Sequence, residues 1–233
     1  MYKRVIIKLS GEALFNGGNT FDDALISQIT TQIKYIMEQG CQVALVVGGG
    51  NYWRGREQAP WLDRAKSDQI GMLATVMNGI YFAQSLVKHD VQAVVQTPIK
   101  IGTITEEFSK ERALSHMKKG RVLVFAGGTG HPFFSTDTIT ALRGAELEAD
   151  ALLFAKNIDG VYDSDPKTNP NAVKIDEIKA SDILKNTLGV VDLSAVSLCL
   201  EAKIPVVIFG LFENAGIVKA ANGERVGTIV TAD

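Results

Sequence analysis

The chain begins with a short apolar strand that ends in a lysine: residues 4–14 read RVIIKLSGEAL. Three β-branched residues, 5–7, run directly into Lys8, and Ser10-Gly11 follows. A buried ammonium group is costly unless it meets a negative partner. Lys8 therefore either extends to solvent, as many lysines do, or meets an anion at the end of the strand.

Six further apolar runs of this kind recur along the chain. Most are continuous rather than alternating, which is typical of strands buried on both faces of a parallel sheet. The alternation with helical segments predicts an α/β fold, a three-layer sandwich with a mainly parallel central sheet flanked by helices. The expected strands are 5–7, 43–47, 91–95, 122–125, 151–154, 206–209 and 228–231. The expected helices are 22–39, 66–88, 106–118, 136–148, 180–187, 193–202 and 214–220.

Length and composition indicate an ordinary globular protein. The 233 residues are expected to form a single domain, 1–233, with a soft division near residue 150. A net charge of −2 gives no support to a primary nucleic-acid binder. The two cysteines form no CxxC motif, so neither a disulfide framework nor a zinc site is expected. The N-terminus has no pattern of a signal peptide, and we expect a cytoplasmic protein that does not bind membranes.

One helical segment is apolar almost all round. Residues 70–87 read IGMLATVMNGIYFAQSLV. Such a helix is buried, either in the core or in a subunit interface. We expect an interface, with the core as the alternative.

Three glycine clusters each follow a predicted strand: Ser10-Gly11, Gly48–Asn51 and Gly127–Gly130. In parallel α/β sheets, ligands bind outside the carboxyl ends of the strands, where glycines let backbone N–H groups approach phosphate oxygens. A single cluster is equally well explained as the end of a strand. Three clusters at equivalent positions predict a phosphate site. The sequence has no GxxxxGK[ST] motif, which excludes a P-loop kinase, and no GxGxxG after the first strand, which argues against a nicotinamide-binding Rossmann domain.

Four charged residues are candidates for that site. Phosphoryl transfer needs positioning and positive charge, and Lys8 could neutralise the transferring group. Arg54 could bind a phosphate. Asp68 is either a first-turn acid that favours the helix dipole or an acceptor for sugar hydroxyls. Asp137 is either a helix cap or a carboxylate that orients Lys8.

Two loop segments complete the candidates. His131 has no His, Cys or carboxylate at ligand spacing, so we assign it no metal. Residues 160–166, GVYDSDP, form either a plain turn or an aromatic shelf and polar rim for a base and ribose, through Tyr162, Asp163 and Asp165.

Taken together, these motifs resemble the bacterial uridylate kinases of the amino acid kinase superfamily, from about Tyr2 to Thr231. Segments 8–11 and 48–50 alone indicate only the superfamily, whereas segments 72–78 and 132–137 are typical of the uridylate branch. The matching motifs are residues 8–14, 48–51 with Arg54-Gly55, 71–78, 129–130 with 132–134 and 136–137, 159–162 and 165–166.

The resemblance implies a reaction and roles for particular residues. The reaction is MgATP + UMP → MgADP + UDP, in pyrimidine nucleotide biosynthesis. The acceptor oxygen is already anionic, so no general base is needed. The implied catalytic residues are Lys8 and Asp137. The implied ATP site comprises Lys8, Ser10, Gly11, Gly50, Arg54, Lys156, Asn157, Tyr162 and Asp165. The implied UMP site comprises Gly49, Asp68, Thr129, Gly130, His131, Pro132, Phe133, Phe134, Ser135 and Thr136.

Further expectations follow from the same resemblance. Relatives often carry Thr or Asn at the position of Lys156, so Lys156 or Asn157 would meet ATP. Asp192 would lie near the ATP phosphates or their Mg²⁺. No protein metal site is implied, and Mg²⁺ would arrive with ATP. Residues 1–150 would mainly bind UMP, and residues 151–233 would mainly bind ATP.

Regulation and assembly are also implied. Bacterial uridylate kinases are typically homohexamers that UTP inhibits and GTP often activates. Members activated by GTP commonly carry basic residues around 83–94, where this chain has Ala83, Val87 and Val94. Segment 16–23 also departs from the usual pattern. We therefore expect inhibition by UTP, in the UMP pocket, and weak or absent activation by GTP.

Two other interpretations compete. Another kinase of the superfamily would phosphorylate an amino acid, a carbamate or an isoprenoid phosphate, but segment 132–137 argues against it. A nucleotide-binding regulator without turnover would keep the glycine clusters and could lose Lys8 or Asp137, yet both are present.

Overall fold

The computed structural model of the protein describes residues 1–11, 20–166, 168–186 and 191–232. Three segments named in the sequence predictions lie outside these ranges: residues 12–14 of the first motif, residues 16–19 of the segment expected to affect regulation, and the last residue of the helix expected over 180–187.

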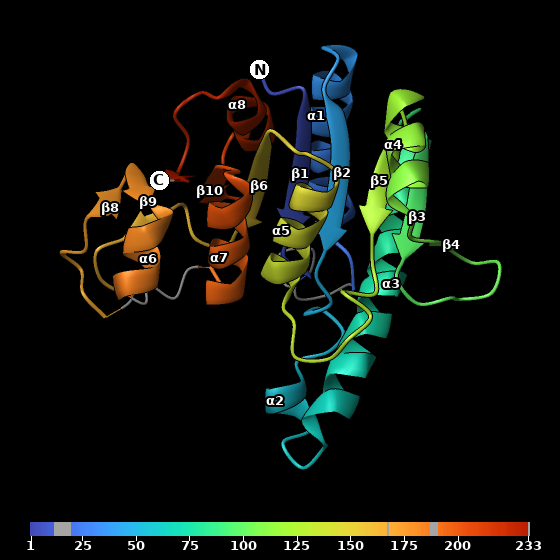
Figure 1. The fold of residues 1–233 in the computed structure, drawn as a ribbon, viewed down its shortest axis with the longest axis horizontal. Coiled ribbons are helices and arrows are strands. Elements are labelled where there is room, and N and C mark those ends of the chain that lie inside the picture. The colour runs from blue at the N-terminus through green and yellow to red at the C-terminus, as the bar shows by residue number, and fades with distance from the viewer. Residues whose placement is uncertain (12–19, 167, 187–190, 233) are drawn as a thin grey trace.

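In the described residues of the chain, a nine-stranded sheet forms the central layer, in the order β4-β3-β5-β2-β1-β6-β10-β11-β9 (Figure 1). Its strands are β1 (Arg4–Leu9), β2 (Gln42–Val47), β3 (Ala93–Thr97), β4 (Glu106–Glu107), β5 (Val122–Phe125), β6 (Ala151–Lys156), β9 (Glu177–Lys179), β10 (Val206–Gly210) and β11 (Thr228–Thr231). Neighbouring strands are parallel, apart from the antiparallel pair β10 and β11. The prediction of a mainly parallel sheet is confirmed. A separate hairpin pairs β7 (Val161–Tyr162) with β8 (Lys174–Ile175).

Helices cover both faces of this sheet (Figure 1). One hydrophobic core lies between the sheet and helices α1 (Asp23–Glu38), α3 (Arg64–Lys88) and α8 (Gly216–Asn222). A second core lies on the opposite face, under α4 (Lys110–Lys118), α5 (Thr136–Glu146), α6 (Ala180–Asn186) and α7 (Leu193–Ala202). The short helix α2 (Gly55–Gln58) precedes α3. The predicted three-layer sandwich is therefore confirmed.

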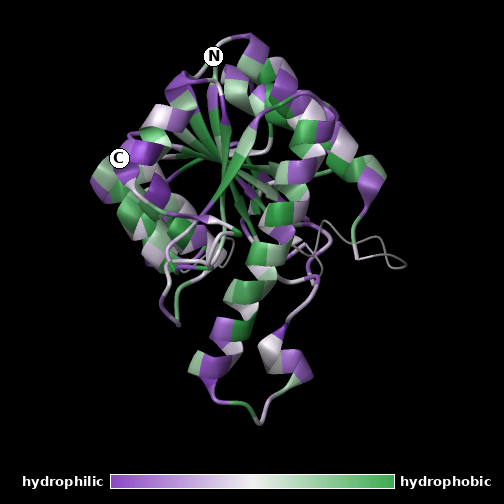
Figure 2. Cartoon of the chain, turned by 90° about the vertical axis from the view of Figure 1, so that its right-hand side faces the viewer, coloured by the Kyte–Doolittle hydropathy of each residue, from purple (hydrophilic) through white to green (hydrophobic). Residues whose placement is uncertain are grey.

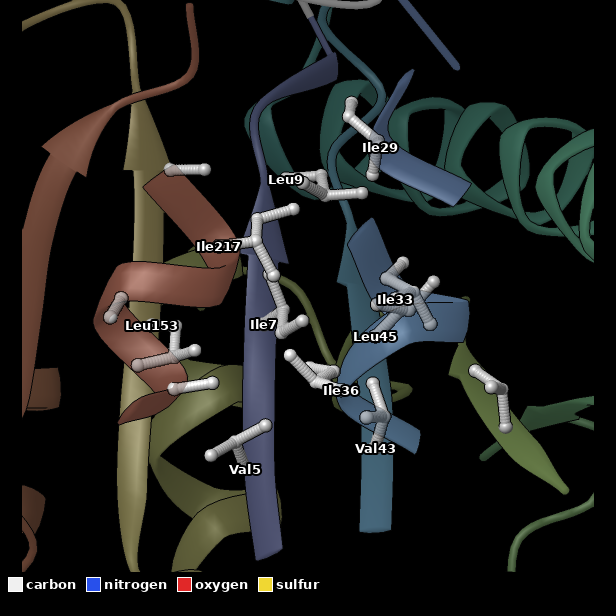
Figure 3. Close-up of a cluster of buried hydrophobic side chains, with 14 of the residues drawn as sticks. Val5, Ile7, Leu9, Ile29, Ile33, Ile36, Val43, Leu45, Leu153 and Ile217 are labelled. Carbon is white, nitrogen blue, oxygen red and sulfur yellow. The ribbon is translucent and has the colours of Figure 1, made fainter. Parts of the chain in front are cut away.

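The side chains of strand β1 are divided between the two cores. Successive residues of a strand point to opposite faces, so Val5, Ile7 and Leu9 pack in the core beneath α1 and α8 (Figure 3). Ile6 packs in the opposite core, beneath α5 and α7. Lys8 follows with the same parity as Ile6, so its ammonium group is directed to the α5 side at the carboxyl end of the strand.

The apolar helix α3 extends beyond the sheet, together with α2 (Figures 1 and 2). Its inner side contributes Phe82 and Leu86 to the core. Its outer side leaves Leu73 and Met77 about half exposed, at 53% and 48%. By length and composition alone α3 could cross a membrane, a test that core helices also pass, and 44% of its most apolar window is buried in the protein. The core alternative thus describes one side of α3, and the predicted interface for the other side stays a prediction.

One expected helix begins later than predicted. The sequence predicts a helix over 106–118, but Glu106 and Glu107 pair with β3 as an edge strand. Ser109 caps α4 by accepting a hydrogen bond from the Arg112 N–H at 3.5 Å. The prediction was wrong at this end because a two-residue strand is too short to show a period of its own.

Candidate active site

Two lysines share one buried carboxylate at the carboxyl ends of the central strands. Lys8 Nζ lies 3.2 Å from Asp137 Oδ1, and Lys156 Nζ lies 2.8 Å from Asp137 Oδ2. Lys8 also donates a hydrogen bond to Ser10 Oγ at 3.0 Å. The side chains of Lys8, Asp137 and Lys156 are only 10%, 9% and 14% exposed. We call these three residues the charge centre. The solvent-exposed alternative for Lys8 is wrong.

Regular secondary structure places all three groups. Lys8 is paired in register with Phe154 of the adjacent strand β6, and Lys156 lies two residues further along β6 on the same face of the sheet. Asp137 lies in the first turn of α5. The cap of that helix is Ser135, whose side chain accepts from the Thr138 N–H at 3.1 Å. The cap alternative for Asp137 is therefore wrong, and its carboxylate is available to both lysines.

Burial and charge act on these groups in opposite directions. Burial lowers the pKa of Lys8 below its ordinary value, and the nearby Lys156 adds to this effect, although Asp137 opposes it. Burial alone would raise the pKa of Asp137, but Lys8 and Lys156 together outweigh it and hold that pKa below its ordinary value. The ionised form of Asp137 is therefore favoured, and the side-chain nitrogens of both lysines face its carboxylate.

Two glycine clusters meet beside the charge centre. A Cβ atom at Gly11 would lie 2.6 Å from Gly48 C and O and 2.7 Å from Gly50 N, so only glycine fits this contact. The second cluster is held from α3, where Asn78 Nδ2 donates to Gly48 O at 2.6 Å. Asn78 also exchanges side-chain hydrogen bonds with Asn51, at 2.6 and 3.0 Å. These contacts create the close backbone approach that a phosphate site requires.

A cavity of about 570 Å³ lies between α3, the second glycine cluster and the start of α5. This volume is in the range of small-molecule sites. Apolar side chains, among them Met72, Phe125 and Ile139, form part of its wall. Six of the ten residues predicted for UMP line it: Gly49, Asp68, His131, Phe134, Ser135 and Thr136.

The loop from Gly127 to Thr136, here called the cavity loop, is hydrogen-bonded to α3 at two points. Thr75 Oγ1 accepts from the Gly127 N–H at 2.7 Å. Asp68 Oδ2 accepts from the Phe133 N–H at 2.8 Å. Phe133 has φ of 74°, an unusual value for a residue with a side chain. The Arg64 guanidinium lies over its ring at 4.9 Å and near Asp68 at 3.8 Å.

Comparison with known proteins places this geometry in a family. Residues 3–210 match the family described as the amino acid kinase family. The chain belongs to the amino acid kinase family. A UMP kinase from Bacillus anthracis is 35% identical and superimposes with a TM-score of 0.95, covering 100% of this chain and 97% of that one. A UMP kinase from Ureaplasma parvum is 35% identical, with a TM-score of 0.92, and covers 99% of each chain. A uridylate kinase from Archaeoglobus fulgidus is 27% identical, with a TM-score of 0.75, and covers 97% of this chain and 99% of that one.

The remaining residues predicted for UMP, and Arg54 predicted for ATP, lie near the cavity or the second glycine cluster. Thr129, Gly130, Pro132 and Phe133 belong to the cavity loop but are not among the residues that line the cavity. Arg54 donates from Nε to Gly50 O at 3.2 Å, so it lies against the second glycine cluster.

The predicted ATP residues of the second half lie at the end of β6, on β7 and in the residues that follow these two strands, and Asp192 lies just before α7. Tyr162 donates to Asp159 Oδ1 at 2.9 Å, and Asn157 and Asp165 are exposed. Asp192 begins α7 without forming a side-chain cap, and its carboxylate acts on the pKa of Lys8.

Sequence reasoning missed several residues of the cavity wall. Trp53, Arg64 and Thr75 line the cavity. Trp53 donates from Nε1 to Ser67 Oγ at 3.0 Å. The spacing of Arg64 and Asp68, four residues apart on one helix, was the available signal for Arg64. Thr75 lies within the matching motif 71–78 but was given no role, and no sequence signal distinguishes Trp53 from a core residue.

Proposed function

We propose that this amino acid kinase phosphorylates UMP with MgATP and releases UDP and ADP, a step of pyrimidine nucleotide synthesis. The observation that carries the proposal is the charge centre beside the cavity, in a chain 35% identical over its length to two UMP kinases. A buried positive site suits the transferring group, and the cavity suits a small acceptor.

The mechanism follows from the charges. An anionic oxygen of the UMP phosphate attacks the γ-phosphorus of ATP, and the bond from that phosphorus to the β,γ-bridging oxygen breaks. No proton has to be removed, so no general base is needed. Lys8 neutralises charge on the transferring group, and Asp137 holds the Lys8 ammonium in place. Such preorganised charges stabilise a transition state without reorganisation.

Mg²⁺ is proposed to arrive with ATP. Among the residues that the structure describes, no three His, Cys, Asp or Glu side chains could together hold a metal ion. The exposed carboxylate of Asp192 is the group that could take part in such a site, because Mg²⁺ commonly keeps its waters and substrate phosphates and adds one or two carboxylates. When bound, Mg²⁺ would neutralise the β- and γ-phosphate oxygens.

The two halves of the chain are proposed to bind different substrates. The cavity residues all fall between Val46 and Ile139, which supports UMP binding by residues 1–150. Lys156, Asn157, Tyr162 and Asp165 belong to residues 151–233, which supports ATP binding there. Ser10, Gly11, Gly50 and Arg54 would contact the ATP phosphates from the first half.

The test is ADP release from MgATP with a panel of acceptors: UMP, CMP, dUMP, AMP, GMP, glutamate, aspartate and carbamate. Turnover with UMP far above the other acceptors is expected. Turnover with an amino acid or carbamate would assign the chain to another branch of the family. Binding of UMP without any turnover would favour a regulator.

Assembly and regulation are proposed from the resemblance and from α3. The exposed apolar side chains Ile70, Leu73, Met77 and Val87 support a homo-oligomer, expected to be a cytoplasmic hexamer. Light scattering tests the hexamer. We expect UTP to compete with UMP. GTP titrated at low ATP should leave the rate almost unchanged, and several-fold activation would contradict this.

A further inference from the structure

Thr228 carries a buried hydroxyl that the proposed mechanism does not use. The residue is fully buried, and it is the first residue of β11. Thr228 Oγ1 accepts a hydrogen bond from the Val161 N–H at 2.8 Å and donates one to Ile175 O. Val161 and Ile175 are opposite each other in the pairing of β7 with β8. One hydroxyl therefore holds both strands of the hairpin to the main sheet.

The direction of β11 decides where this contact lies. β11 runs antiparallel to β10, and their pairing ends with Thr228 opposite Ile208. The beginning of β11, rather than its end, thus lies toward the carboxyl ends of the parallel strands, where ligands bind in α/β sheets. Gly227 allows this entry, because it has φ of 61° and a Cβ atom there would lie 1.9 Å from Ile208 O.

The hairpin is also continuous with the charge centre. β7 begins shortly after Lys156, the last residue of β6. Tyr162 on β7 donates to Asp159 Oδ1 at 2.9 Å, and a Cβ atom at Gly210 would lie 3.5 Å from Asp159 Cα. A two-stranded hairpin is marginally stable by itself. Its position beside the charge centre therefore depends on contacts with the main sheet, such as the one at Thr228.

We propose that Thr228 is a positioning residue for ATP, whose hydroxyl fixes the hairpin of β7 and β8 and thereby sets the place of Tyr162 at the nucleotide. This proposal rests on the proposed function. Loss of the hydroxyl leaves the Val161 N–H and the Ile175 carbonyl without this partner, so the hairpin separates from β11 in part of the molecules. The apparent affinity for ATP then falls by the fraction of molecules in which the hairpin is still in place.

A purely structural role must be separated from this one. In a structural role, loss of the hydroxyl lowers the free energy of unfolding but leaves the relative affinities for ATP and UMP unchanged. In a positioning role the effect is confined to ATP, because the residues that line the cavity all fall between Val46 and Ile139, outside the hairpin and β11. The ratio of the two KM values therefore distinguishes the roles.

The experiment compares Thr228→Val with Thr30→Val. Thr30 is equally buried, but its hydroxyl has no hydrogen-bond partner among the described residues. For Thr228→Val, KM for ATP and the calorimetric Kd for MgADP should rise about tenfold. Its KM for UMP and its kcat should stay within about threefold of the wild type, because only uniform binding is lost. Thr30→Val should change neither KM by more than about twofold.

Thr228→Ser keeps the hydroxyl and should retain the affinity for MgADP to within about threefold of the wild type. Amide hydrogen exchange of the wild type adds a measurement that needs no variant. MgADP should slow exchange of the Val161 N–H at least about fivefold, because bound nucleotide disfavours opening of the hairpin. UMP alone should leave that rate within about twofold.

Three results would overturn the positioning role: equal increases of both KM values in Thr228→Val, an unchanged KM for ATP in that variant, or exchange at Val161 that MgADP does not slow. If Thr228→Val does not fold, the exchange measurement on the wild type decides. Failure of the proposed function is distinct from these results, because the wild type itself would then not phosphorylate UMP.

Discussion

The charge centre and the cavity loop are adjacent but differently built. The charge centre consists of side chains on β1, β6 and α5, which are 10%, 14% and 9% exposed. The cavity loop has positive φ at Gly127, Gly128, Gly130 and Phe133, and it leaves Phe133 and Phe134 63% and 55% exposed. Regular elements hold a group more precisely than loops do, whereas loops can adapt to a ligand.

This difference suggests a division of labour. Substitutions in the charge centre should act on kcat, because that centre meets charge that develops only in the transition state. Substitutions around the cavity loop should act on KM for the acceptor. The predictions below test this division, from the largest effect to the smallest.

The largest effect is expected from Lys8→Ala. The variant should fold and bind UMP, because the cavity wall does not include Lys8. Its kcat should fall by about 10³-fold or more, the scale of a lost electrostatic contact in a transition state. Steady-state kinetics and calorimetric UMP binding measure the two quantities. Near-normal turnover would remove Lys8 from the mechanism. It would also contradict the division of labour between the charge centre and the cavity loop.

Gly11→Ala should disturb the contact between the first two glycine clusters, which lies beside the charge centre. The new Cβ would lie within 2.7 Å of backbone atoms of Gly48 and Gly50, which cannot move as a flexible side chain can. We expect a loss of about 1–3 kcal/mol in the free energy of unfolding and lower affinity for ATP. The matched control is Gly71→Ala on α3, where the nearest atom would be Trp53 Cδ1 at 3.7 Å.

In that control, alanine should raise stability by about 0.5–1 kcal/mol, because glycine is unfavourable inside a helix. Chemical denaturation measures both variants. Equal stability of the two variants would show that the glycine clusters are not in the tight contact described here.

Asp68→Asn should act on the acceptor. The carboxylate accepts from the Phe133 N–H and lies near Arg64, so the variant weakens the tie between α3 and the cavity loop. We expect KM for UMP to rise about tenfold, the scale of one charged hydrogen bond, with kcat little changed. Initial rates at varied UMP and at varied ATP separate the substrates. A change confined to ATP affinity would assign Asp68 to the other site.

The smallest effect concerns acid stability. Lys8 and Lys156 hold the pKa of Asp137 below its value in the unfolded chain, despite burial. This group therefore contributes stability that is present above its unfolded pKa and is lost as pH falls through the lower folded pKa. We expect the melting temperature to fall more steeply below about pH 4 in the wild type than in Asp137→Asn. Parallel curves for the two proteins would contradict this pairing.

The sequence limited Lys8 to two alternatives, because a buried ammonium group is costly. Lys8 could extend to solvent or meet an anion, and the structure places it against Asp137. The glycine clusters predicted a phosphate site, which stays a prediction, and the structure brings two of the clusters into close contact at Gly11 and Gly48. The apolar helix allowed two explanations, and the structure supports burial for one of its sides, while the interface stays a prediction.

The sequence by itself determined the layered fold and seven of the nine strands of the central sheet, because hydrophobic period is a local property. The end of the sheet where ligands bind stays a prediction. Only the tertiary structure decided that Lys156 joins Lys8 on Asp137, and that Trp53, Arg64 and Thr75 line the cavity. These contacts depend on strand order and register, which bring together residues far apart along the chain, as Lys8 and Asp137 are. The sequence offered the pairing of Lys8 with Asp137 as one of two alternatives for Asp137, but no local pattern indicated that Lys156 joins it.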